Sequence, residues 1–402
     1  MATKYDFDQI PDRSNSNSVK WEAMTVMDPR ANADTLPFWV ADMDFVCAPP
    51  ILEALRSRVE KGVFGYSRPD VAYFSAVCNW YKRRFDWDIP VEAIKFSPGV
   101  VPAVSFLIEI LSNPGDGIII QQPVYYPFME KILAAGRLIV NNALIHERDG
   151  YYRMDFDDLR EKVKDHKVLV LCSPHNPVGR VWHEDELRTL GEICLDHGVT
   201  IISDEIHNDL IRRGIKHTVL ETLFPDRKDR IITCVAPSKS FNLAGLQISS
   251  VIMHDPELSA KWRQYVAARL SLFLPNPLSI VGAQAAYSEG EEWLEELIDY
   301  LDANLAFTEE FIKSRMPKAV FRKPEGTYLI WINVSGYHAD MKVLMDNMIT
   351  HGNVLIEEGG MFGSSSAHFL RMNVACPRSL LEEGLKRMAM VLDMDNSVAA
   401  IE

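Results

Sequence analysis

The sequence lacks long apolar runs and any excess of basic charge. No run of apolar residues approaches the roughly 18 that a membrane span needs, and Val168–Cys172 is typical of those present. The first residues are polar and mixed in charge, so we expect neither a signal nor a transit peptide. With 42 basic and 56 acidic residues, the formal charge is −14. Phosphodiester backbones are also negative, so we expect no nucleic-acid partner and no membrane partner.

Cysteine is scarce as well, and its spacing gives no sign of a metal site. None of the six cysteines forms a CxxC pair. Several stand inside apolar runs, which is typical of buried free thiols in a reducing compartment. A chain of 402 residues, 47% of them hydrophobic, can bury a core without disulfides or metal. We therefore expect a cytoplasmic globular protein.

What the sequence does contain is an alternation of short apolar runs with amphipathic segments. The segment Glu184–His197 has helical periodicity, and near-continuous apolar strands separated by helices predict a parallel sheet covered on both faces. In such sheets the functional residues follow the carboxyl ends of the strands. The runs of strand length are Gly117–Gln121, Leu138–Ile145, Val168–Cys172, Val199–Ser203, Ile231–Val235 and Ile248–Met253.

From Glu291 the pattern changes. A long amphipathic helix is expected to about Arg315, followed by a mixture of strands and helices. We therefore predict an α/β protein with a mainly parallel large domain and a smaller α+β domain. The expected boundaries are an N-terminal arm over 1–45 that joins the small domain, a large domain over 46–288 and a small domain over 289–402.

Three of the predicted strands are followed by polar side chains of different chemistry. Asn176 follows the third strand, Asp204 the fourth and Lys239 the fifth. Taken singly, each has an ordinary explanation: a turn, a helix cap and a surface lysine. Together they place an amide, a carboxylate and an amine at one sheet edge. This set suits pyridoxal 5′-phosphate (PLP), which needs an amine for its Schiff base and a carboxylate for its pyridine nitrogen.

Ten segments spread over nearly the whole chain carry a resemblance to a known family. The chain resembles fold-type-I PLP enzymes of the aminotransferase superfamily, and within them the cystathionine β-lyase/cystalysin-like carbon–sulfur lyases. The segments are NSVKW (17–21), PFWVADMDF (37–45), FGYSRPD (64–70), SPGVVPAVS (97–105), QPVYYPF (122–128), SPHNPVGRVW (173–182), SDEIHNDL (203–210), APSKSFNLAGLQ (236–247), KPEGTYLIW (323–331) and FLRMNVACPRS (369–379).

The resemblance implies roles around the cofactor ring. Lys239 matches the Schiff-base lysine, and Asp204 matches the partner of the pyridine nitrogen. Asn176 matches the donor to the phenolic oxygen. Tyr125 matches the aromatic ring that stacks on the pyridine face. His207 stands where aspartate-type aminotransferases often have a tyrosine that contacts the phenolic oxygen.

The resemblance also implies a phosphate site. Gly99, Val100 and Val101 open a predicted helix, whose amides and positive dipole end suit an anion. Ser238 adds a hydroxyl. Tyr66 matches a residue that reaches the phosphate of the neighbouring subunit, which implies a homodimer.

For the substrate, the resemblance implies that Arg371 binds the α-carboxylate with its two-pronged guanidinium, assisted by backbone amides near Val40. Lys239 would take the α-proton, and Lys239 or Tyr126 would protonate the leaving thiolate. The expected activity is β-elimination from L-cystathionine or related cysteine S-conjugates, giving a thiol such as homocysteine, pyruvate and ammonia.

Two alternatives remain open: an amino-acid aminotransferase, and a lyase with an added regulatory role through protein contact. Departures from the aspartate-type pattern favour the lyase branch. Gln247 replaces a phosphate-binding arginine, and Ala236 replaces a phosphate-binding hydroxyl. Together with His207, these differences leave fewer charged groups to bind the phosphate.

Overall fold

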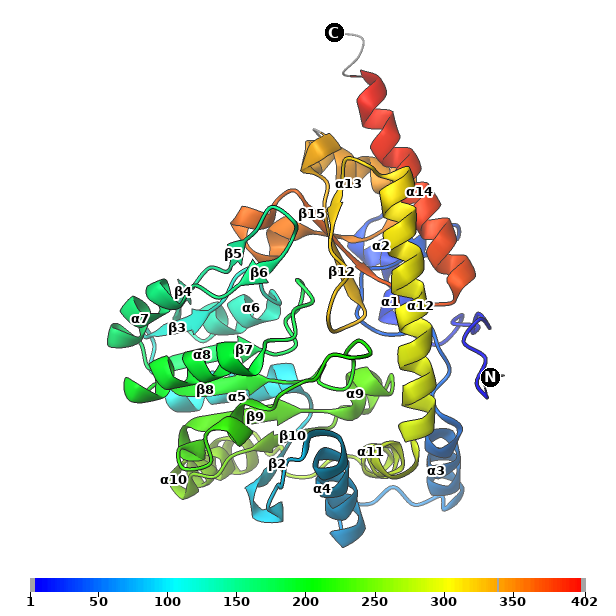
Figure 1. Ribbon diagram of the computed structural model, residues 1–402. Helices are drawn as coiled ribbons and strands as arrows, with labels where there is room; N and C mark the ends of the chain where they lie inside the picture. The colour runs from blue at the N-terminus through cyan, green and yellow to red at the C-terminus, as the bar shows by residue number, and fades with distance from the viewer. Residues whose placement is uncertain (1–3, 338–339, 399–402) are drawn as a thin grey trace.

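The computed structural model describes residues 4–337 and 340–398, and its largest feature is a central sheet (Figure 1). Within the described residues this sheet has seven strands, and six of them run parallel. The exception, β10, is antiparallel to both of its neighbours. The mainly parallel α/β fold predicted from the sequence is thus confirmed. The strand order is β2 (Ile94–Ser97), β10 (Ser249–Ile252), β9 (Ile231–Val235), β8 (Thr200–Asp204), β7 (Val168–Cys172), β3 (Gly117–Ile120) and β4 (Leu138–Asn141).

Successive side chains along each strand point to opposite faces of the sheet and pack into two separate hydrophobic layers. In β3, Ile118 and Ile120 pack with the helices on one face, whereas Ile119 packs with those on the other. A strand whose two faces are both covered reads as a continuous apolar run, because successive side chains point to opposite sides. One face is covered by α5 (Val100–Leu111), α6 (Pro127–Ala134) and α10 (Pro256–Trp262), and the other by α7 (Phe156–Asp165) and α8 (Glu184–Asp196).

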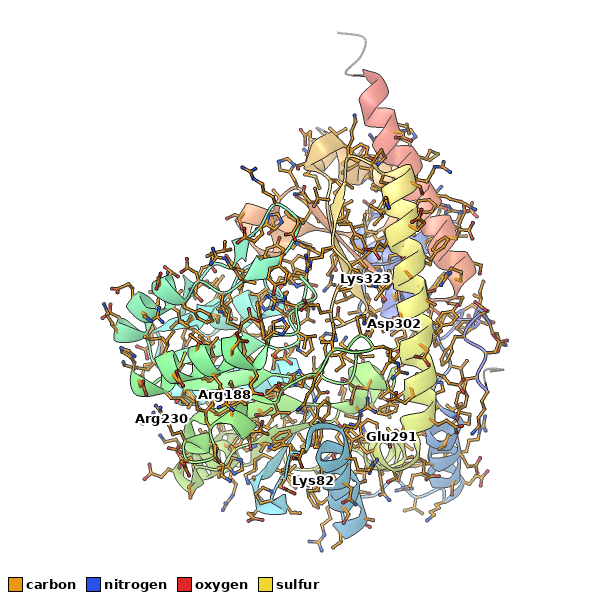
Figure 2. The ribbon with its side chains drawn as sticks, viewed as in Figure 1. Lys82, Arg188, Arg230, Glu291, Asp302 and Lys323 are labelled. Atoms are coloured by element: carbon orange, nitrogen blue, oxygen red, sulfur yellow. The ribbon has the colours of Figure 1, made fainter. Side chains whose placement is uncertain are left out.

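A second group of helices packs beside the sheet and ties it to the rest of the chain. Trp80 and Tyr81 are fully buried in its aromatic core. The long helix α12 runs from this group to the C-terminal part, and its acidic residues, among them the Glu291 and Asp302 labelled in Figure 2, face basic ones. Arg84 Nη1, for example, lies 2.7 Å from Glu295 Oε1. The helices are α3 (Pro49–Glu60), α4 (Val71–Phe85), α11 (Pro277–Glu289) and α12 (Glu291–Arg315).

The C-terminal part forms its own sheet and core, to which the N-terminal segment contributes. Strand β1 (Leu36–Pro37) pairs in parallel with β13 (Val354–Leu355). The proposed domain boundaries stay a prediction, and residues 1–3, 338–339 and 399–402 of the expected arm and small domain lie outside the described residues. The remaining elements here are α1 (Val19–Glu22), α2 (Met24–Met27), β11 (Val320–Phe321), β12 (Leu329–Asn333), α13 (Met341–Thr350), β14 (Glu357–Glu358), β15 (Phe369–Asn373) and α14 (Arg378–Val398).

Two details differ from the sequence-based expectation. The apolar run Leu138–Ile145 is not one strand: β4 ends at Asn141, and β5 (Ile145–His146) pairs with β6 (Tyr152–Arg153) in a separate two-stranded sheet. Strand β2 was not expected, because its four residues include the polar Lys95 and Ser97 and so form no continuous apolar run. In the part of the chain that the structure describes, no helix is long and apolar enough to cross a membrane, and no cluster of His, Cys, Asp or Glu could hold a metal ion.

Candidate active site

Asn176, Asp204 and Lys239 meet in one cavity. Their strands β7, β8 and β9 are direct neighbours, so their carboxyl ends lie at the same edge of the sheet. Asp204 is the last residue of β8, and Lys239 stands in the short helix α9 (Pro237–Ser240) after β9. The cavity is lined by Ala41, Val100, Val101, Tyr125, Cys172, Asn176, Asp204, Ile206, His207 and Lys239.

Lys239 is an amine held among mixed charges. Its Nζ donates a hydrogen bond of 2.5 Å to the backbone carbonyl of Ala41. Burial and the nearby Arg371 lower the pKa of Lys239 to about 8, against the attraction of Asp42, Asp204 and Glu357. A lysine with a pKa near neutrality supplies a neutral, nucleophilic amine far more often than a surface lysine does.

Asp204 is a buried carboxyl group, 4% exposed, whose side chain bonds to a backbone N–H and not to a basic side chain of the described residues. Its Oδ1 accepts a hydrogen bond of 3.1 Å from the backbone N–H of Ile206. Burial raises the pKa of Asp204 to about 7, although that hydrogen bond and Lys239 oppose the rise. Such a group gains strongly from a cationic N–H partner, since the partner would stabilise the ionised form.

His207 is another buried polar group without a full set of partners. Its ring lies 6.0 Å from that of Tyr328, edge to face, and its Nδ1 has no hydrogen-bond partner among the described residues. Burial, together with Lys239 and Arg371, holds the pKa of His207 well below its usual value, so the imidazole is neutral. A neutral imidazole in this cavity can give one hydrogen bond and accept another.

Arg371 reaches the cavity from β15, in the C-terminal part, and already has three partners. It donates to Asn176 Oδ1 at 3.0 Å and to the carbonyl of Trp39 at 3.1 Å, and it forms an ion pair with Glu357. The Asn176 contact uses the amide oxygen, so the Nδ2 group is the side that can donate to a bound molecule. Glu357 was not expected from the sequence. It faces Arg371 only because β14 and β15 pair in a register that sets these two residues opposite each other.

Two adjacent tyrosines form an aromatic wall. Tyr125 lines the cavity, and its ring centroid lies 5.7 Å from that of Tyr126. Tyr126 is half-buried and packs edge to face on Phe362 at 5.6 Å. Burial raises the pKa of both tyrosines, and Glu357 adds to the rise. Both phenols are therefore protonated at neutral pH, and Tyr126 has a proton to donate.

The residues expected at the phosphate site are partly gathered here. Val100 and Val101 line the cavity at the start of α5, and Gly99 is the residue that precedes the helix. The free N–H groups and the positive dipole end of a three-turn helix favour an anion at this point. Ser238 is half-buried in α9 but does not line the cavity.

Tyr66 and Val40 were also expected at the site, but neither of them lines the cavity. Tyr66 is 96% exposed, on the segment between α3 and α4, and does not line the cavity of its own chain. The carbonyl of Val40 accepts a hydrogen bond of 2.8 Å from Asn373 Nδ2. The neighbouring carbonyls of Trp39 and Ala41 are the ones that contact Arg371 and Lys239. The motif over 37–45 was the only signal in the sequence for these carbonyl contacts.

Comparisons with known proteins agree with this geometry. The model of the family described as aminotransferase class I and II matches residues 40–388. Cystathionine beta-lyase PatB of Bacillus subtilis is 42% identical, over 96% of this chain and all of that protein. The PLP-containing crystal structure of cystalysin from Treponema denticola superposes with a TM-score of 0.93 at 36% identity, covering 97% of this chain and 99% of that one. The PLP-bound C-S lyase of Staphylococcus hominis gives a TM-score of 0.91 at 35% identity, with the same coverage. The chain belongs to the aminotransferase class I and II family.

Proposed function

We propose that this protein is a PLP-dependent carbon–sulfur β-lyase. It would cleave L-cystathionine or related cysteine S-conjugates to a thiol, pyruvate and ammonia, as part of amino-acid metabolism. The observation that carries the proposal is the meeting of a low-pKa amine, Lys239, with an unpaired buried carboxyl group, Asp204, in one cavity. The similarity to PatB, cystalysin and the S. hominis lyase over nearly the whole chain supports the same reaction.

The residues of the cavity fit the cofactor. Lys239 offers the amine for a covalent link, and Asp204 offers the carboxylate that a protonated pyridine nitrogen needs. Asn176 and His207 offer hydrogen bonds to the phenolic oxygen, and Tyr125 offers a ring face. Gly99, Val100, Val101 and Ser238 would hold the phosphate. When bound, PLP supplies an electron sink that makes the α-proton of an amino acid acidic.

The chain itself supplies binding and proton transfer. Arg371 would bind the substrate α-carboxylate, and the backbone near Val40 would support it. The neutral amine of Lys239 would take the α-proton at Nζ, because its pKa of about 8 suits a base near neutral pH. The electron pair of the broken C–H bond then forms a Cα=Cβ double bond as the C–S bond breaks, the sulfur leaves with the electron pair of the C–S bond, and Lys239 or the Tyr126 hydroxyl returns a proton to it. The released aminoacrylate takes up one water molecule and hydrolyses to pyruvate and ammonia.

We further propose a cytoplasmic homodimer in which Tyr66 reaches the phosphate site of the neighbouring subunit. The 96% exposure of Tyr66 supports this, since a tyrosine is rarely left so bare without a partner. Val63 and Phe64 on the same segment, and Val71 at the start of α4, are also more than half exposed. The six cysteines are free, which suits a reducing compartment.

The decisive experiment incubates the purified protein with L-cystathionine and no keto acid. Release of pyruvate together with a free thiol supports the lyase, whereas the absence of pyruvate refutes it. An aminotransferase would instead transfer the amino group to an added keto acid faster than it eliminates. The regulatory alternative is tested with Lys239→Ala, because capture of a protein partner from cell extract should survive the loss of the amine.

A further inference from the structure

One irregular segment supplies backbone acceptors to several active-site side chains. We call residues 39–45 the strap; they belong to neither a helix nor a strand. The carbonyl of Ala41 accepts from Lys239 Nζ at 2.5 Å and from Tyr328 Oη at 2.8 Å. The carbonyl of Trp39 accepts from Arg371 at 3.1 Å. The positions of the amine and of the guanidinium therefore both depend on where the strap lies.

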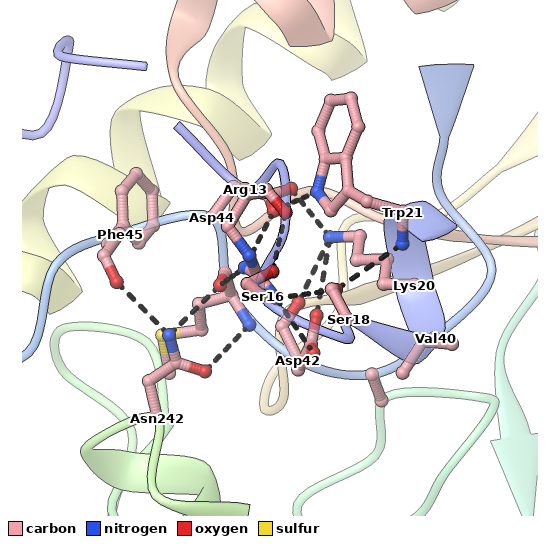
Figure 3. A network of polar contacts seen from close by, with 12 residues as sticks. Arg13, Ser16, Ser18, Lys20, Trp21, Val40, Asp42, Asp44, Phe45 and Asn242 are labelled. Atoms are coloured by element: carbon pink, nitrogen blue, oxygen red, sulfur yellow. Dashed lines mark hydrogen bonds and ion pairs between the residues drawn. The ribbon is translucent and has the colours of Figure 1, made fainter. Parts of the chain in front are cut away.

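The strap is held from its other side by a network of charged groups (Figure 3). Lys20, whose side chain is 0% exposed, donates to Asp44 Oδ2 at 2.6 Å and to the carbonyl of Asp42 at 3.1 Å. Trp21 Nε1 donates to Asp44 Oδ1 at 2.7 Å. Arg13 Nη1 reaches the same oxygen and the carbonyl of Met43, both at 3.2 Å. We call Arg13, Lys20, Trp21 and Asp44 the clamp.

The clamp joins two segments that no regular structure holds together. The helices that carry Lys20 and its neighbours, α1 and α2, have only four residues each. Other anchors hold the strap on the cavity side, including Asn373 Nδ2, which donates to the carbonyls of Val40 and Asp42. A buried ion pair contributes little net stability, because desolvation of both charges offsets their attraction. Its geometry is demanding, however, so it favours one position of the strap over others.

We propose that Lys20 and Asp44 are positioning residues of the active site, which act by fixing the strap carbonyls against Lys239 and Arg371. The substrate-dependent part of this inference rests on the proposed function. Four charged groups face Lys239: Arg371 from β15, Asp42 from the strap, Asp204 from β8 and Glu357 from β14. Only Asp42 belongs to the strap, and it also lies 3.8 Å from Lys20. A displaced strap would thus take both an acceptor and an anion away from Lys239.

The first test needs no catalysis. In the full chain freed of cofactor, the acylation of Lys239 by acetic anhydride is followed against pH by mass spectrometry. The wild type should show a midpoint near pH 8, following the pKa of Lys239. In Asp44→Asn the strap is no longer fixed, so the ammonium group of Lys239 loses stabilisation. We therefore expect the midpoint of Lys239 acylation to fall by about half a pH unit or more. Trp21→Phe removes one donor to Asp44 and should give a smaller fall.

A matched control separates positioning from general destabilisation. Arg137 is a buried cation, 4% exposed, that pairs with Glu109 near the opposite end of α5 from the cavity. Arg137→Met should lower the thermal unfolding midpoint as Asp44→Asn does, but leave the Lys239 midpoint at the wild-type pH. In the holoenzyme, Asp44→Asn should raise KM for L-cystathionine at least several-fold. Of the two Lys20 variants, Lys20→Arg keeps the positive charge, so its KM should stay closer to the wild-type value than that of Lys20→Met. The control should keep the wild-type KM.

The outcomes are distinct. If Asp44→Asn has the same midpoint of Lys239 acylation and the same KM as the wild type, the proposal that the clamp positions the strap is refuted. If Asp44→Asn does not fold, Trp21→Phe decides in the same way. If the wild type releases no pyruvate, the proposed function fails, but the acylation profiles still decide whether the clamp positions the strap.

Discussion

The ion pair between Arg371 and Glu357 gives a sharp prediction, because both groups are buried. Arg371 is 2% exposed and Glu357 6%. In Arg371→Ala, the carboxylate of Glu357 would be left inside the protein without its cation. Breaking a buried pair from one side typically costs about 3–5 kcal/mol, whereas removing both charges costs much less. The double variant Arg371→Ala/Glu357→Gln should therefore be more stable than the single variant Arg371→Ala.

The effect should depend on pH in a definite direction. Burial already raises the pKa of Glu357 in the folded protein, although Arg371 opposes the rise. Without Arg371 the folded-state pKa rises further above the unfolded value. A group of this kind stabilises the fold below its unfolded pKa and loses that contribution as the pH rises through the folded pKa. The single variant should therefore lose stability as the pH rises above the unfolded pKa of a glutamate, about 4.3, and the double variant should not.

The assay is urea unfolding of wild type, single and double variants at pH 5.5 and pH 8. We expect the single variant to fall below the double variant by up to about 3–5 kcal/mol at pH 8, with a smaller gap at pH 5.5. Both variants should also bind substrate more weakly, by about 2–4 kcal/mol, or some thirty-fold to several-hundred-fold in KM. Equal stability of the two variants at pH 8 would refute the view that Arg371 neutralises a buried carboxylate.

Three further predictions concern single side chains of the site. Tyr126→Phe should lower kcat for L-cystathionine and leave cofactor retention intact, as judged by the absorbance of the dialysed protein; an unchanged kcat would remove Tyr126 from proton transfer. Asp204→Asn should weaken cofactor retention about ten- to a hundred-fold, because a charge-assisted hydrogen bond of about 1.5–3 kcal/mol is lost; equal retention would contradict its pairing with the pyridine nitrogen. Tyr66→Phe should weaken cofactor retention about ten-fold without altering the unfolding midpoint of the cofactor-free chain; full retention would argue against a phosphate contact from the neighbouring subunit.

The sequence by itself determined the architecture of the sheet and the chemistry of its edge. Buried parallel strands must be apolar on both faces, so runs such as Val168–Cys172 are visible without a structure. Residues that directly follow neighbouring strands must share an edge, which brought together Asn176, Asp204 and Lys239. These inferences need only local patterns and short motifs. The division of Leu138–Ile145 into two strands was missed, because an apolar run does not reveal where its hydrogen-bonding partner changes.

Only the tertiary structure decided which groups face one another across long separations in the chain. Glu357 meets Arg371 through the register of β14 and β15, and Lys20 of the short helix α1 meets Asp44 of the irregular strap. No periodic pattern in the sequence indicates such pairs, because the residues next to each partner carry no information about which distant residue it will contact. The lowered pKa of Lys239 and the raised pKa of Asp204 likewise arise from burial and from distant charges. Desolvation and Coulomb energy depend on distances in space, so they become readable only once the chain is folded.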